Sequence, residues 1–314
     1  MNKGKIAEML GIEYPIFQGG MAWIADAELA AAVSNAGGLG IIAAGNADGD
    51  YVRTQIQKAK ELTDKPFGLN IMLLSPFADE VAQIAAEERV PVITTGAGNP
   101  AKYMKMWLEA DIKVIPVVPS ITFAKIAERN GACAVIAEGG ESGGHIGELA
   151  TITLVPQVCD AVNLPVIAAG GIADGRGIAA AFALGAEAVQ LGTRFLSATE
   201  CNIHENYKKK VLKAGDTATV VTGRRLGHPV RSIKNQFARE YAKMEYTDIS
   251  NEELENFGTG KLRLAVVEGD EKNGCFLAGQ SAAMVTKEET CKEIIDDLWQ
   301  DAERILGGLK KWEK

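Results

Sequence analysis

A glycine-rich stretch, AEGGESGGHIGE, carries one of the three histidines of the sequence, His145. It directly follows the apolar run Ala134–Ile136, so Glu138 ends a predicted strand and His145 lies in the loop after it. Imidazole titrates near neutral pH, and a histidine in such a loop can donate or accept a proton. We interpret His145 as the candidate catalytic residue; the alternative is a surface histidine on a mobile turn.

Two glycine turns follow predicted strands later in the chain, in AAGGIADGRG and ALGAEAVQLGTRF. Because glycine has no Cβ and threonine has only a small side chain, a ligand can closely approach the backbone N–H groups of Gly170, Gly171, Gly192 and Thr193. Loops after the seventh and eighth strands form the usual phosphate site of (β/α)8 barrels, and a helix N-terminus after each turn adds a favourable dipole. The turns therefore predict phosphate binding; the alternative is that the glycines only make tight turns.

A further glycine turn, QGGMAW, and the stretch FGLNIMLLSPF end two other predicted strands. Strand ends on one rim converge on one cavity, so we expect Gly20, Met21 and Asn70 to contact a flat ligand next to the phosphate. No serine, cysteine or lysine is placed beside a histidine as a nucleophile would be, and no H-E-x-x-H or similar metal motif occurs. These features favour a cofactor that performs the difficult chemistry itself, and flavin mononucleotide (FMN) has both the phosphate and the planar ring.

Eight short apolar runs that end in glycine or another turn residue predict the strands that position these sites. They are PIFQGG (15–20), LGIIAAG (39–45), PFGLNIM (66–72), VPVITTG (90–96), KVIPVVPS (113–120), AVIAEG (134–139), PVIAAGG (165–171) and AVQLGTRF (188–195). The runs are continuous rather than alternating, as parallel strands covered on both faces are, and helical patterns separate them. The sequence predicts an α/β fold, a (β/α)8 TIM barrel with a smaller inserted lid subdomain after strand 8.

After Phe195 the alternation of strand and helix stops, and an amphipathic helical pattern returns only at 287–312. We expect residues 1–203 and 282–314 to form the FMN-binding barrel, and residues 204–281 to form an inserted lid or substrate subdomain. Because it follows the eighth strand, the insertion is expected over the C-terminal mouth, where barrel enzymes keep their active sites.

The composition of the chain argues against several classes of protein. No apolar run approaches the roughly 20 residues of a membrane span, and the N-terminus lacks the apolar core of a signal peptide, so a cytoplasmic protein with no membrane partner is expected. Five cysteines without zinc-like spacing indicate reduced thiols and no metal site.

Charge is distributed unevenly along the chain, whose net charge is −8. Segment 208–239 has nine basic residues and one acid, which indicates an acidic partner or a phosphate ligand; the alternative is a solvated face paired with local carboxylates. Its single aromatic residue, Phe237, argues against nucleic acid as a partner.

Several stretches together resemble one known family: YPIFQGGMAW, AGGLGIIAAGN, DKPFGLNIMLLSPF, ITTGAGNP, VIAEGGESGGHIGE, PVIAAGGIADGRG and GAEAVQLGTRF. They are similar to the FMN-dependent enoyl-acyl carrier protein (ACP) reductase II family, within the broader nitronate monooxygenase-like flavoprotein superfamily. The resemblance runs from near the N-terminus to beyond GQSAAMV (279–285). TTGAGNP and NIMLLSPF favour the enoyl reductase branch, whereas QGGM, GGHxGE and AGGIADGRG are shared across the superfamily.

The resemblance implies hydride transfer from NADH or NADPH through FMN to trans-2-enoyl thioesters, the last step of fatty acid elongation, with His145 near the flavin. It also implies an ACP-linked substrate, a homodimer and, in some members, stimulation by a monovalent cation. FMN contacts are implied at Gly20, Met21, Ala22, Asn70, Glu138, Gly143, Ala169, Gly170, Gly171, Gly192 and Thr193. A nitronate monooxygenase or NAD(P)H:quinone reductase is the alternative enzyme, and a flavin-carrying barrel without turnover is the alternative outside enzymes.

Overall fold

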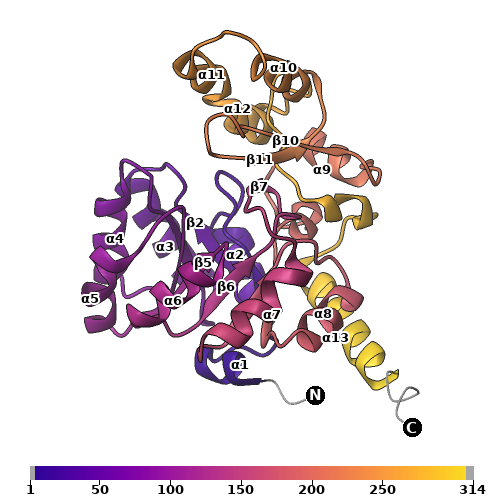
Figure 1. Cartoon of the computed structure of the whole chain (residues 1–314). Coiled ribbons are helices and arrows are strands. Elements are labelled where there is room, and N and C mark those ends of the chain that lie inside the picture. Colours follow the sequence, from indigo (N-terminus) through magenta and orange to yellow (C-terminus); the bar gives the residue numbers. More distant parts are fainter. Residues whose placement is uncertain (1–3, 309–314) are drawn as a thin grey trace.

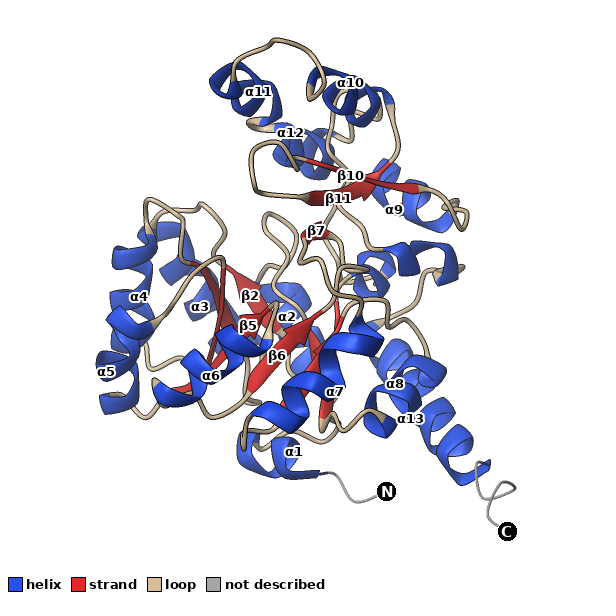
Figure 2. Ribbon diagram, viewed as in Figure 1, coloured by secondary structure: helices blue, strands red, loops and turns tan. Residues whose placement is uncertain are grey.

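Eight parallel strands form the barrel that the sequence predicts (Figures 1 and 2). The computed structural model describes residues 4–308. The strands follow the order β1-β9-β8-β6-β5-β4-β3-β2 around the sheet. They are β1 (Ile16–Gln18), β2 (Ile41–Ala43), β3 (Gly68–Met72), β4 (Val92–Gly96), β5 (Lys113–Val118), β6 (Val135–Glu138), β8 (Val166–Ala169) and β9 (Ala188–Leu191). Each strand lies within one of the eight predicted runs.

The side chain of Gln18 closes the seam between β1 and β2, where a backbone bridge joins Phe17 to Leu39. Gln18 is fully buried; its Nε2 donates to the Ile41 carbonyl at 3.2 Å, and its Oε1 accepts from the Ile41 N–H at 3.1 Å. The side-chain amide thus takes the place of a neighbouring strand and leaves no open sheet edge at the seam.

Helices wrap the outside of the barrel. They are α1 (Gly4–Leu10), α2 (Ala27–Asn35), α3 (Gly49–Leu62), α4 (Ala78–Glu87), α5 (Ala101–Glu109), α6 (Ile121–Arg129), α7 (Thr151–Ala161), α8 (Gly175–Ala183) and α13 (Cys291–Gly308). Helix α13 packs against both α8 and α2 through a buried stripe that includes Ile294, Ile295 and Leu298. It therefore takes the place of the eighth barrel helix.

The chain between β9 and α13 folds over one end of the barrel (Figure 1). Its elements are η1 (Thr193–Ser197), α9 (Glu205–Leu212), β10 (Thr219–Thr222), β11 (Val230–Ile233), α10 (Gln236–Met244), α11 (Asn251–Gly258), α12 (Lys261–Arg263), η2 (Leu264–Glu268) and η3 (Gln280–Met284). Strands β10 and β11 pair antiparallel, and β11 also pairs with β7 (Gly144–His145), a short strand in the loop after β6. The sequence predicts the insertion as a lid but does not predict its sheet. The expected limits of the insertion, 204 and 281, stay predictions.

The inner face of the barrel changes from apolar to polar toward the end that carries the insertion. Side chains two residues apart on a strand share a face, so Glu138 follows the buried Ile136 on β6, and Gln190 follows the buried Ala188 on β9. Asn70 lies in the middle of β3 on the same face. The fold therefore places three polar side chains around the mouth of an otherwise apolar barrel.

The lengths of the helices and the state of the cysteines bear on the class of protein rather than on the site. No helix within residues 4–308 is both long and apolar enough to cross a bilayer. All five cysteines are free thiols, as the sequence predicts.

Candidate active site

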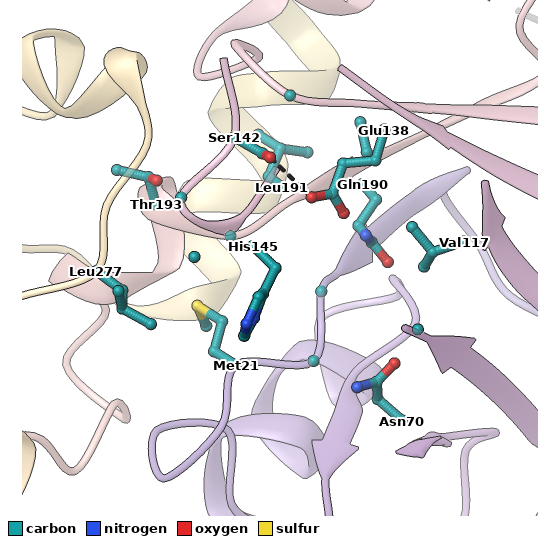
Figure 3. Close-up of a pocket in the computed structure, with 18 of the residues that line it drawn as sticks. Met21, Asn70, Val117, Glu138, Ser142, His145, Gln190, Leu191, Thr193 and Leu277 are labelled. Carbon is teal, nitrogen blue, oxygen red and sulfur yellow. Dashed lines mark hydrogen bonds between the residues drawn. The ribbon is translucent and has the colours of Figure 1, made fainter. Parts of the chain in front are cut away.

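A cavity of about 270 Å³ at the barrel mouth brings together every predicted site residue (Figure 3). Its walls include His145 and the eleven residues expected to hold the cofactor: Gly20, Met21, Ala22, Asn70, Glu138, Gly143, Ala169, Gly170, Gly171, Gly192 and Thr193. They come from β3 and from the ends of β1, β6, β8 and β9, so the argument from a shared strand rim predicts their placement. The role of each residue stays a prediction.

The glycine turns after β8 and β9 form one wall of the cavity. Gly170 and Gly171 have left-handed backbone conformations, with φ of +98° and +75°. A Cβ at Gly170 would lie 2.8 Å from the carbonyl oxygen of Gly139, so glycine lets this turn approach the loop after β6. Within residues 4–308, the N–H groups of Gly170, Gly171, Gly192 and Thr193 donate to no protein acceptor. Four free donors around one cavity suit an anion such as phosphate.

The two glycine turns lead into different helices. The carboxylate of Asp174 caps α8 by accepting from the N–H groups of Arg176 at 2.9 Å and Gly177 at 3.2 Å. After β9 the chain forms only the short 3-10 helix η1. A helix N-terminus therefore follows the turn after β8, where Asp174 occupies its first N–H donors, and only a short 3-10 helix follows the turn after β9.

The loops after β1 and β3 form a second wall. Gly20 packs so closely against Asn70 that a Cβ at Gly20 would lie 2.3 Å from the Asn70 Cβ. Asn70 Oδ1 accepts a hydrogen bond from Thr94 Oγ1 at 2.9 Å, which orients the amide and leaves its Nδ2 free to donate to a ligand. Met21 Sδ lies 3.6 Å from the position of a Cβ on Gly192, so the two walls adjoin. The thioether of Met21 suits the face of a planar ring, and the amide donor of Asn70 suits its edge.

Glu138 and Gln190 face the same cavity from the inside of the barrel (Figure 3). Within residues 4–308, the carboxyl group of Glu138 makes one hydrogen bond: Ser142 Oγ donates to its Oε1 at 2.7 Å. Loss of hydration raises the pKa of Glu138 to about 7, although the Ser142 hydrogen bond acts in the opposite direction. Glu138 is half-buried and lines the cavity, so a ligand in the cavity would displace water from the carboxyl group.

His145 is held at the cavity by the inserted sheet. Val230 of β11 pairs with it, and the N–H of Ile146 donates to the carbonyl of Pro229 at 3.0 Å. The ring is exposed on the cavity wall, yet protein surrounds it on several sides. This desolvation, together with the nearby His228, lowers the pKa of His145 from its ordinary value of 6.5. The imidazole is therefore neutral at physiological pH and has one N–H to donate.

The segment that leads from the insertion back to α13 completes the cavity, and the sequence does not reveal it. Leu277 and Ala278 line the cavity. A Cβ at Gly143 would lie 2.6 Å from the carbonyl carbon of Ala278, and the N–H of Gly279 donates to Thr193 Oγ1 at 2.8 Å. No local pattern marks these residues, because their place depends on how the insertion folds back.

Two other lining residues, Ser142 and Gln190, had a signal in the sequence that was not used. Ser142 lies within the glycine-rich stretch around His145, and Gln190 is a polar residue inside the apolar run AVQLG. A polar side chain in a strand that is buried on both faces needs a hydrogen-bond partner. For Gln190, a ligand in the cavity can provide that partner.

Carboxylates pair with part of the basic segment 208–239. Four of its cations form ion pairs: Lys208 with Glu288, Lys209 with Glu205, Lys210 with Glu271, and Arg224 with Glu148. Arg225 instead donates to the carbonyl groups of Thr247 and Ile249 and so fixes the loop before α11. For these five residues the structure shows local pairing.

The cavity fits FMN on the chemistry of its groups. The free N–H groups of the two glycine turns provide donors for a phosphate, and Met21 with Asn70 provides a surface for a flat ring. Gln190 and Glu138 provide polar partners for a hydroxylated chain between them. The four N–H groups that line the cavity without a protein acceptor in residues 4–308 are the observation on which this fit rests, because such groups can donate to a bound anion.

Comparison with known proteins agrees with this assignment of the fold. The structure is similar to that of FabK from Thermotoga maritima, with a TM-score of 0.97 and 51% identity over 99% of this chain and 100% of that chain. A (3aS,4S,5R,7aS)-5-hydroxy-7a-methyl-1-oxo-octahydro-1H-indene-4-carboxyl-CoA dehydrogenase from Mycobacterium tuberculosis is 34% identical over 95% of each chain. A probable nitronate monooxygenase from Staphylococcus aureus is 35% identical over 91% of this chain and 93% of the other. The family model for nitronate monooxygenase matches residues 3–301, and the chain therefore belongs to the nitronate monooxygenase family.

Proposed function

We propose that the protein is an FMN-dependent enoyl-ACP reductase, which uses NADH or NADPH to reduce trans-2-enoyl thioesters in fatty acid biosynthesis. FabK is an enoyl-ACP reductase of type II, and the chain is its homologue at 51% identity over essentially the whole length. This full-length likeness carries the proposal. The cavity supports it, because it combines an anion site, a surface for a planar ring and a neutral histidine.

FMN, when bound, would supply the hydride transfer from NAD(P)H to the β-carbon of the enoyl thioester, which no side chain can perform. The turns at Gly170 and Gly192 would bind its phosphate, and Asn70 would orient its ring. As the β-carbon accepts hydride, negative charge develops on the thioester oxygen, and an N–H donor such as His145 stabilises that charge. We assign His145 this hydrogen bond or the delivery of a proton to the α-carbon.

Anaerobic stopped-flow absorbance on the FMN-loaded protein tests the proposal. The flavin is reduced with NADH or NADPH and then mixed with crotonyl or longer enoyl thioesters while reoxidation is followed. Rapid reoxidation, matched by saturated thioester in the product, is expected. A flavin that stays reduced with every enoyl thioester would reject the reductase activity.

A second activity, nitronate oxidation, is favoured by the names of several relatives, since one at 35% identity is a probable nitronate monooxygenase. The same experiment separates the two activities: reoxidation only by oxygen in the presence of a nitronate, or only by a quinone, assigns the protein to one of these branches. The names alone do not choose, because this fold hosts many reactions.

The carrier, oligomer and cation form the finer part of the proposal. We expect an ACP-linked substrate, a homodimer in solution and stimulation by a monovalent cation, as the family resemblance implies. Size-exclusion chromatography with light scattering tests the dimer, and turnover in sodium, potassium and ammonium salts at constant ionic strength tests the cation.

A further inference from the structure

The carboxyl group of Glu138 has an unusual position for an acid. It lies on the inner face of the barrel, and its Oε1 accepts a hydrogen bond from Ser142 at 2.7 Å. Its second oxygen, Oε2, has no hydrogen-bond partner within residues 4–308, and the residue lines the cavity. A carboxylate in such a place has one protein donor, Ser142, and would lose contact with water when a ligand fills the cavity, which is costly for a charged group.

Within residues 4–308, no cation compensates this acid. The strands on either side of β6 present Val117 from β5 and Ala169 from β8, and β9 presents the uncharged amide of Gln190. Three titratable groups lie on the loop that follows β6, and one of them, Glu148, forms an ion pair with Arg224. The carboxylate of Glu141 accepts hydrogen bonds from the N–H and hydroxyl of Thr151, and His145 is neutral at physiological pH. Burial is the main influence on Glu138, and no charged side chain contributes to the shift of its pKa.

We propose that Glu138 meets the flavin as a neutral carboxylic acid that donates a hydrogen bond from Oε2, and that Ser142 is the positioning residue that orients it. This inference rests on the proposed flavin site and deepens it. Because Oε1 accepts from Ser142, the proton of the neutral acid resides on Oε2, the oxygen that is left for the ligand. An ionised Glu138 would have no proton to donate and would repel an anionic ligand.

The proposal implies that FMN binding is coupled to the protonation of Glu138. If only the protonated form binds, the apparent dissociation constant of FMN equals the intrinsic constant divided by the protonated fraction of Glu138. Since burial raises the pKa of this group to about 7, that fraction falls across the neutral range. FMN should therefore bind more weakly as pH rises, by roughly 25-fold between about pH 6.5 and pH 8.5.

The test is FMN binding to the apoprotein, measured by the change in flavin fluorescence across this pH range. Glu138→Gln is the matched variant, because the amide keeps the shape and an N–H donor but cannot ionise. We expect its affinity to depend only weakly on pH, so that the ratio of wild-type to variant affinity shows the roughly 25-fold fall. Dividing the two curves removes the ionisation of the phosphate, whose second pKa is about 6.

Ser142→Ala provides a readout that a merely structural role would not move. The hydrogen bond from Ser142 favours the charged form of Glu138. Its loss should shift the midpoint of the wild-type pH dependence upward by about half to one pH unit, whatever its effect on absolute affinity. A midpoint that stays in place or moves down overturns the assignment of Ser142.

The outcomes separate the two levels of inference. If FMN binds to the wild type and to Glu138→Gln with the same pH dependence, or binds more tightly as pH rises, the neutral acid is wrong and the flavin site stands. If FMN binds to neither protein at any pH, the flavin site itself is wrong, and with it the proposed reductase.

Discussion

Glu138 and His145 depart from their ordinary pKa values in opposite directions for one physical reason. Loss of hydration penalises a charged side chain, so it raises the pKa of an acid and lowers the pKa of a base. The pKa of Glu138 accordingly rises to about 7, and that of His145 falls below 6.5. At the acidic end of the physiological range, both side chains are therefore mostly neutral, and the strongest charge in the loaded cavity would be that of the ligand.

Replacing His145 by alanine should lower kcat/KM for an enoyl thioester by about 10²- to 10⁴-fold, the usual contribution of a positioned proton donor. FMN should remain bound, because the phosphate wall does not involve this ring; the flavin absorbance of the purified protein checks this. His204→Ala is the control, since His204 caps α9 through the N–H of Asn206 and lies outside the cavity. Full turnover by His145→Ala would remove His145 from the mechanism.

The pH dependence of unfolding gives a second prediction for Glu138. A pKa raised from 4.5 to about 7 in the folded state stabilises the protein below pH 4.5, and this contribution is lost as pH rises through 7. Relative to the wild type, Glu138→Gln should therefore gain about 3 kcal/mol of unfolding free energy between pH 4.5 and pH 8. Urea unfolding of both apoproteins at the two pH values measures the difference. If the unfolding free energies of the two proteins differed by the same amount at both pH values, the pKa of Glu138 in the folded protein would be its ordinary one.

At the scale of elements, the sequence predicts what local periodicity determines. Each barrel strand is a continuous apolar run that ends in a turn residue, so all eight were recognisable without tertiary information. Strand β7 has only two residues, and it exists because Val230 of a distant hairpin pairs with His145. Leu277 likewise reaches the cavity only through the return of the insertion. Such elements depend on contacts that no local pattern records.

The two glycine turns should respond differently to an added methyl group. Gly170→Ala forces a side chain into a left-handed conformation (φ +98°) and against the Gly139 carbonyl, so we expect a loss of about 1–3 kcal/mol of stability and weaker FMN binding. Gly192→Ala is the matched control, because φ is −107° there and the nearest neighbour of the new methyl group, Met21 Sδ, is at 3.6 Å. Thermal unfolding and FMN titration compare the two variants.

Equal losses in the two glycine variants would show that the backbone conformation of the turn after β8 is not what holds the site. A loss confined to FMN affinity in Gly192→Ala, with stability unchanged, would instead agree with a ligand that lies against the turn after β9.

For the whole molecule, the insertion is a structural wall of the active site rather than a separate body. Besides the pairing of β7 with β11, the guanidinium of Arg231 donates to the Gly140 carbonyl at 2.8 Å. The hydroxyl of Tyr207, which is fully buried, donates to the Leu277 carbonyl at 2.8 Å. The first two contacts join the insertion to the loop after β6, and the third fixes Leu277 within the insertion, so the loop that carries His145 and the insertion should move together.

The basic residues of the insertion give a prediction for the carrier. Arg224 is exposed and pairs with the exposed Glu148 of the barrel, so an acidic ACP can compete for it. Arg224→Glu should therefore raise KM for an ACP-linked enoyl substrate more than for crotonyl-CoA, whereas Lys105→Glu on α5 makes the same change in charge away from the insertion. Arg225 is unsuitable because it fixes the loop before α11. Equal effects on both substrates would exclude Arg224 from carrier binding.

The pairing of His145 with Val230 also bears on the order of events during synthesis. Translation adds residues from the N-terminus, so the first six barrel strands leave the ribosome well before the hairpin that fixes β7. A nascent chain that ends before β11 therefore displays the glycine-rich loop without its partner strand. Cofactor capture should then be a late event, and a ribosome stalled before Val230 should carry an emerging barrel that cannot yet retain flavin.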